Sequence, residues 1–200
     1  MLLTRLARPV TLPPMATLTD VLQGVMTADP SGGWLQRVYQ QLEGVHWGAL
    51  RNPGTITSGP DTRTVELVDG PMTLPCVIET DTLMVAFEDA RDGALPTGTA
   101  ADPRRHHVSR AIEALRTLAQ ARARAQGLET DPLFGIIVVG GDDVPEPHRT
   151  TILEGLPHIE REQAEDLYAN YWGRIGAEAL LPFLPSSAAT AISRHATTRK

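Results

Sequence analysis

The sequence predicts a mixed α/β protein in which a helix is followed by three strands, a second helix and a fourth strand. Two observations carry this prediction. The hydrophobic period changes from helical to extended after residue 63 and returns to helical near residue 104. Phe134–Gly140 is a continuous apolar run, which is typical of a central strand covered on both faces. With 200 residues, 42% of them hydrophobic, the chain is long enough to bury a substantial core.

The first third of the chain is expected to be helical. Residues 1–30 are expected to form an irregular arm with one short helix at Leu18–Met26. After the break at Asp29–Gly33, apolar residues recur at spacings of three and four, which predicts an amphipathic helix. Its apolar face consists of Trp34, Leu35, Val38, Tyr39, Leu42, Val45 and His46.

Three strand candidates follow a loop at residues 51–63 that is rich in Gly, Pro, Thr and Ser. They are Thr64–Asp69, Thr73–Glu79 and Thr82–Glu88. The link at Thr80–Asp81 is short enough to join the last two strands as an antiparallel hairpin.

The second half of the chain begins with a loop at residues 89–103, followed by a long amphipathic helix at Arg104–Gln126 and the Phe134–Gly140 strand. Two short helices are expected at Glu160–Tyr171 and Arg174–Leu181. The expected organisation is therefore an α/β core at 31–143, a helical extension at 144–185 and a disordered tail at 186–200.

Composition narrows the class of protein. The net charge of −6 excludes a generally basic nucleic-acid coat. The only lysine is Lys200, and this use of arginine in place of lysine is typical of a GC-rich bacterial genome. The single cysteine, Cys76, excludes an internal disulfide. Because Met1–Pro14 is a poor signal peptide and too short to span a membrane, we expect a cytoplasmic location and no membrane partner.

One stretch carries a specific resemblance. Leu74–Arg91 reads Leu-Pro-Cys-Val-Ile-Glu-Thr-Asp-Thr-Leu-Met-Val-Ala-Phe-Glu-Asp-Ala-Arg. It resembles the hairpin of PD-(D/E)XK nucleases, in which Pro-Asp, an apolar hairpin and Glu-x-Lys bring two acids and a lysine to one end of a sheet. There the carboxylates hold Mg²⁺, and the lysine orients the attacking water. The resemblance implies a restriction-endonuclease-like α-β-β-β-α-β core over residues 34–143, with a C-terminal helical extension.

The resemblance also implies that the nuclease site is at least partly dismantled. Cys76 occupies the position of the first Asp, Glu88 matches the acid, and Ala90 occupies the position of the lysine. A thiol is a poor ligand for Mg²⁺, and alanine offers no charge. Arg91 is a weak substitute that only a bulge or turn after Glu88 would bring round. The leading expectation is a catalytically impaired protein that binds nucleic acid or serves as an assembly component of a DNA-processing or defence system, without a cofactor.

An active Mg²⁺-dependent nuclease with a rearranged site is the first alternative. Glu88 would be its acid and Arg91 its basic residue, and Asp61 or Glu43 would supply a further metal ligand.

The helix at 104–126 offers candidate phosphate contacts in Arg105, Arg110 and Arg116. These arginines lie away from the predicted apolar stripe, so a solvated face is the alternative interpretation. His106 and His107 are adjacent and point in different directions, which excludes a shared metal site. His148 and His158 stand in proline-rich turns, where a cap or turn role is expected.

The segment 160–184 gathers large apolar side chains, including Tyr168, Tyr171 and Trp172. These side chains either pack on the core or present a surface to a protein partner or a second copy of the chain. The second possibility gives a further class of function, a helper protein without a nucleic-acid role that acts through its C-terminal helices.

Overall fold

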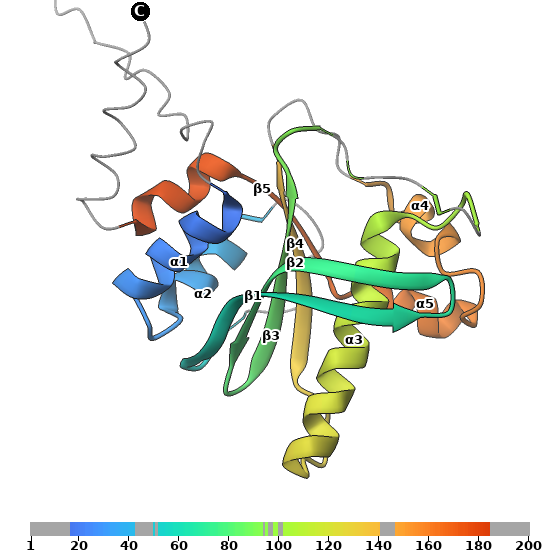
Figure 1. Ribbon diagram of the computed structural model, residues 1–200, viewed down its shortest axis with the longest axis horizontal. Helices are drawn as coiled ribbons and strands as arrows, with labels where there is room; N and C mark the ends of the chain where they lie inside the picture. Colours follow the sequence, from blue (N-terminus) through green and yellow to red (C-terminus); the bar gives the residue numbers. More distant parts are fainter. Residues whose placement is uncertain are drawn as a thin grey trace, which may run out of the picture.

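A five-stranded sheet separates two groups of helices in this protein (Figure 1). The computed structural model describes residues 17–42, 50, 52–93, 95, 98–99, 102–140 and 147–184. The helices are α1 (Leu18–Ala28), α2 (Gly33–Tyr39), α3 (His107–Gln126), α4 (Arg149–Glu154), α5 (Arg161–Tyr168) and the 3-10 helix η1 (Ala177–Phe183). The strands are β1 (Ile56–Leu67), β2 (Gly70–Thr80), β3 (Leu83–Ala90), β4 (Leu133–Gly140) and β5 (Tyr171–Gly176). The predicted mixed α/β class is confirmed.

The strands lie in the order β1-β2-β3-β4-β5. β1, β2 and β3 pair antiparallel as a meander, and β3-β4 and β4-β5 pair parallel. Parallel neighbours need a crossover connection, which α3 provides between β3 and β4. In the same way, α4 and α5 lie in the connection from β4 to β5.

The two faces of the sheet bury separate cores, and β3 shows the division. Its residues Met84 and Ala86 pack with α3, α4 and α5, whereas Val85 and Phe87 pack with α1, α2 and η1. In Figure 1, α1, α2 and the red η1 segment accordingly lie on one side of the sheet, and α3, α4 and α5 on the other. Alternation of side chains along a strand therefore decides which core, and which chemistry, each residue of β3 can reach.

Local sequence signals explain the helix ends. α1 begins with a capping box, in which the Thr17 hydroxyl accepts from the Asp20 backbone N–H and the Asp20 carboxylate binds the Thr17 backbone N–H. α3 ends at Gly127, whose φ of 63° is the left-handed conformation that glycine adopts without strain.

β1 is longer than the predicted strand, because residues 56–63, expected as a loop, belong to it. β1 pairs only with β2 and forms an edge of the sheet, where Pro60 removes no ladder hydrogen bond from an inner strand. Register shifts between Ile56 and Arg63 accommodate the Gly-Pro pair.

The helix predicted at Arg174–Leu181 is wrong. Residues 171–176 form β5 beside β4, and residues 177–183 form η1. Among the described residues 147–184, the C-terminal segment consequently adds one strand to the sheet and is not a wholly helical extension. Aromatic and β-branched residues suit a strand, and pairing with β4 overrides the weak helical pattern.

Some predictions lie outside the described residues. They concern the arm at residues 1–16, the tail at 186–200 and the continuation of the second helix to His46. Within the described ranges, no helix combines the length and the apolar character that a membrane span requires.

Candidate functional site

The end of β3 holds the residues singled out by the hairpin motif, and the ladder between β2 and β3 assigns them to faces. Cys76 lies opposite Phe87, so its side chain shares the face of Phe87 and of Asp89 two residues further on. Cys76 and Phe87 both pack in the core on the α1 side. Glu88 alternates with them and points to the α3 side, where it meets His107. Cys76 and Glu88 therefore lie on opposite faces of the sheet and do not converge on one ion.

Asp89 and Arg91 form a closed pair on the Cys76 face. The Arg91 guanidinium binds both carboxylate oxygens of Asp89, with Nε–Oδ1 at 2.8 Å and Nη2–Oδ2 at 2.6 Å. Burial works to raise the pKa of Asp89, but the hydrogen bonds and charge of Arg91 outweigh it and hold that pKa below its ordinary value. Asp89 is therefore an ionised acid, and each of its two oxygens accepts a hydrogen bond from Arg91.

Cys76 is a buried thiol, 1% exposed, whose Sγ lies 3.0 Å from the Thr19 hydroxyl of α1. Burial raises the pKa of this thiol, and the negative charges of Asp89 and Glu88 raise it further, whereas the hydrogen bond with Thr19 and the charge of Arg91 oppose the change. The burial that the sequence predicted for this thiol is confirmed. The Asp89–Arg91 pair shares this face with Cys76, since Cys76 lies opposite Phe87 and Asp89 follows Phe87 by two residues.

Glu88 lies on the α3 face and is 2% exposed. Its Oε2 lies 2.8 Å from Nε2 of His107, the first residue of α3, while its Oε1 is buried without a hydrogen-bond partner. Burial raises the pKa of Glu88, and the bond to His107 offsets this only in part. Glu88 and His107 thus form a carboxyl–imidazole contact at the edge of the core.

The other residues of the proposed metal site are not brought to Glu88 as a ligand set. Asp61 is exposed on the edge strand β1 and forms an ion pair with Arg63 at 3.3 Å. Ala90 is 1% exposed in the core on the α3 side. Glu43 lies outside the described residues. In the ranges that the structure describes, no three His, Cys, Asp or Glu side chains are grouped as a metal site would require.

Two of the three candidate phosphate-binding arginines are committed to internal ion pairs. Arg105 is 2% exposed and bonds Asp69 (Nε–Oδ2 2.9 Å), the carbonyl of Gly155 (2.7 Å) and Glu113. Arg110 pairs with Asp69 at 3.0 Å. Burial works to raise the pKa of Asp69, but the two arginines hold it below its ordinary value.

These contacts join the β1–β2 turn to α3 and α4. Arg105 therefore fits neither interpretation of the sequence analysis, because it is buried and bound to internal partners. Arg105 precedes α3, whereas Arg116 lies on α3 and is partly exposed.

The large side chains of the C-terminal segment point inward. Tyr168, Tyr171, Trp172 and Leu180 are all less than 10% exposed and belong to the two cores. For these four side chains, the packing alternative of the sequence analysis is confirmed.

Sequence reasoning missed Asp89 and His107. The signal for Asp89 was present, because a two-residue turn pairs even-numbered with odd-numbered residues across a hairpin. Cys76 must then share a face with Asp89 and not with Glu88. His107 had no such signal, because it meets Glu88 only through the packing of α3 on the sheet.

Replacing Glu88 by Gln is expected to raise the free energy of unfolding at pH 8 by about 1–2 kcal/mol, since it removes a buried charge with an unpaired oxygen. A carboxyl whose folded pKa is raised contributes stability below its ordinary pKa and loses it as pH rises through the folded pKa. Gln stays neutral throughout, so the difference from the natural protein should grow with pH. Urea unfolding at pH 5, 6, 7 and 8 measures it.

The matched control is Glu129→Gln, in the exposed loop after α3. We expect no pH-dependent difference for this variant. An equal difference at every pH for Glu88→Gln would contradict the role assigned to the buried carboxyl.

Comparison of the chain with protein-family models, with curated proteins and with solved structures found no match. The case for a function therefore comes from the residues of this chain.

Proposed function

We propose that the chain is a restriction-endonuclease-like protein without metal-dependent phosphodiester hydrolysis, which binds nucleic acid or serves as an assembly component of a DNA-processing or defence system. The order α2-β1-β2-β3-α3-β4 supports this proposal, because it contains the α-β-β-β-α-β succession that the hairpin resemblance implies. The element order is thus consistent with the class that the hairpin resemblance implies.

The observation that carries the proposal is the grouping of Cys76, Asp89 and Arg91 on one face. When the motif is aligned by strand face, Pro75-Cys76 takes the place of Pro-Asp. Asp89-Ala90-Arg91 then takes the place of acid-x-base, with Asp89 and not Glu88 as the acid. A nuclease site needs two carboxylates open to a hard cation. Here one is replaced by a buried thiol, and the other is held by both arms of the Arg91 guanidinium. The positions of these residues match those of the nuclease hairpin, but the residues themselves do not provide two carboxylates open to a cation.

The test incubates the purified chain with single-stranded DNA, duplex DNA and RNA in Mg²⁺ and in Mn²⁺, with cleavage measured on gels and binding measured by fluorescence anisotropy. We expect no cleavage, together with an affinity for at least one of these nucleic acids that falls steeply as salt increases. Metal-dependent cleavage would overturn the loss of catalysis. Absence of any salt-sensitive binding would overturn the nucleic-acid role.

A variant that restores the nuclease residues tests whether positions 76, 89 and 91 correspond to the nuclease site. The double variant Cys76→Asp with Arg91→Lys is expected to bind Mn²⁺ where the natural chain does not, as measured by isothermal titration calorimetry on protein whose fold is verified by circular dichroism. The matched control is Cys76→Asp with Ala90→Lys, which places the lysine on the opposite face. Mn²⁺ binding by the control variant and not by the first would refute this correspondence.

A further inference from the structure

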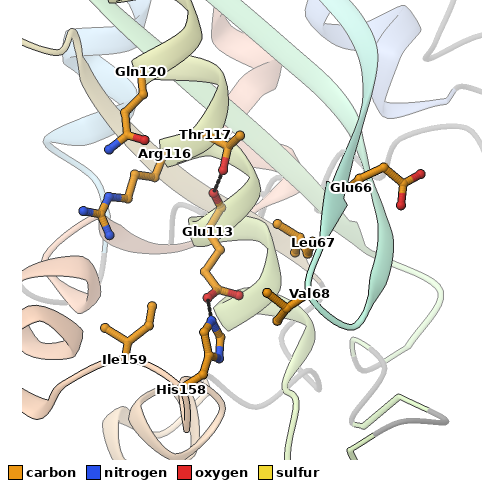
Figure 2. Close-up of a pocket in the computed structure, with 9 residues that line it drawn as sticks. All are labelled: Glu66, Leu67, Val68, Glu113, Arg116, Thr117, Gln120, His158 and Ile159. Atoms are coloured by element: carbon orange, nitrogen blue, oxygen red, sulfur yellow. Dashed lines mark hydrogen bonds and ion pairs between the residues drawn. The ribbon is translucent and has the colours of Figure 1, made fainter.

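A hollow of about 410 Å³ lies on the α3 side of the sheet, away from the group of Cys76, Asp89 and Arg91 (Figure 2). α3 forms one wall, the end of the β1–β2 hairpin a second, and the connection between α4 and α5 a third. Its volume falls within the range of sites for small molecules.

Glu113, the buried acid in this hollow, already has two partners. Glu113 is 9% exposed and binds Arg105 through Oε2 and His158 through Oε1, the latter at 2.5 Å. Figure 2 shows Glu113 extending from α3 to the His158 ring. Both carboxylate oxygens already have partners, which partly offset the charge that Glu113 presents to a ligand. His158 thus holds a buried acid, in addition to its place in the turn that the sequence predicted.

Arg116 is the uncommitted charge of the hollow. Among the residues that the structure describes, the guanidinium of Arg116 has neither a hydrogen bond nor an ion pair. Arg105, Arg110 and Arg122 of the same region all have carboxylate partners. Gln120 follows one turn later, and Figure 2 shows both side chains extending to the same side of α3. Together they offer a guanidinium and an amide as adjacent donors.

The opposite wall is apolar. Leu67 and Val68 end the hairpin, and Ile159 lies on the α4–α5 connection. Val68 is 81% exposed, a large apolar side chain left open to solvent at the rim. Glu66, the remaining acid of the lining, points away from the hollow in Figure 2. A ligand here meets apolar side chains at one end and two donors at the other.

We propose that this hollow binds a small organic carboxylate, with its carboxylate on Arg116 and Gln120 and its apolar body against Leu67, Val68 and Ile159. A planar guanidinium matches a carboxylate in a two-point geometry. A single negative charge suits the site better than a dianion, because Glu113 lies in the hollow and Asp166 lies near Arg116, in an adjoining hollow of about 200 Å³. Asp166 forms no ion pair with Arg116 and competes with the ligand only through its charge.

The test uses hexanoate and phenylacetate as probes, with hexanamide and phenylacetamide as neutral counterparts of the same shape. Binding to the full chain is followed by ¹H–¹⁵N NMR titration. We expect the acids to shift the signals of Arg116 and Gln120 in a saturable way, at least tenfold more tightly than the amides. Equal affinities for acid and amide, or no saturable shift by either acid, would overturn the proposal.

Variants locate the contact. Arg116→Met keeps the aliphatic part of the side chain and is expected to weaken binding of hexanoate and phenylacetate at least tenfold. Arg124→Met, on an exposed part of α3 outside the hollow, should leave their affinity unchanged. Asp166→Asn should raise the affinity for both acids, because it removes the negative charge that competes with them. Equal losses in the two arginine variants would refute a specific site.

A chain terminus presents the same carboxylate, so an N-acetylated tripeptide with a free carboxyl end is included. If the tripeptide binds and neither small acid does, the assignment to a small molecule is overturned.

Discussion

Arg105→Met is expected to lower the free energy of unfolding by about 3–5 kcal/mol, because it leaves two buried carboxylates without their main cation. Asp69 and Glu113 are 8% and 9% exposed, and Arg105 binds both. Its third bond, to the carbonyl of Gly155, fixes the end of α4. Loss of the guanidinium therefore leaves two buried negative charges without this partner, where the hairpin, α3 and α4 meet.

Urea denaturation of the variant and the natural chain at pH 7 measures this loss. The control is Arg104→Met, one residue earlier, where the side chain is 66% exposed and pairs with Asp102. A surface pair of this kind is screened by solvent, so the stability of Arg104→Met is expected to stay close to that of the natural chain. Arg105→Met combined with Glu113→Gln should recover part of the loss, since it removes one of the stranded charges. Equal effects of the two arginine variants would refute the buried role of Arg105.

Much of the fold could be predicted because its signals are local. The spacing of apolar residues in α1 and α3 and the short turn between β2 and β3 depend on neighbours within a few positions. The first part of β1 could not be predicted, because its Gly, Pro and Thr residues are those of a loop unless the strand lies at an edge. β5 is six residues long, and only its pairing with β4 makes it a strand.

The candidate sites divide in the same way. The grouping of Cys76, Asp89 and Arg91 follows from strand alternation and was within reach of the sequence. The ion cluster was not, because Arg105 meets Asp69 from 36 residues away and an arginine is ordinarily expected at the surface. The hollow beside Arg116 likewise depends on three segments that only the tertiary fold assembles.

Gly135→Ala is expected to lower the free energy of unfolding by about 3 kcal/mol, because the added methyl group has no room. Gly135 lies in the inner strand β4, and a Cβ at this position would stand 2.0 Å from Cε2 of Trp172. The indole of Trp172 cannot move freely, since it packs edge-on against Tyr39 with ring centroids 5.1 Å apart. Either the indole or the β4 backbone must shift, and both lie between packed neighbours.

Thermal and urea unfolding measure the loss, and Gly33→Ala is the control. A Cβ at Gly33 meets its nearest atom at 3.4 Å, an ordinary contact, so stability there should be unchanged or slightly higher. The clash with Trp172 can be isolated in a double-mutant cycle. Trp172→Leu alone should destabilise by leaving a cavity, but in its presence Gly135→Ala should cost much less than in the natural chain. Strict additivity of the two changes would mean that the cost of Gly135→Ala arises in the β4 backbone and not at the indole.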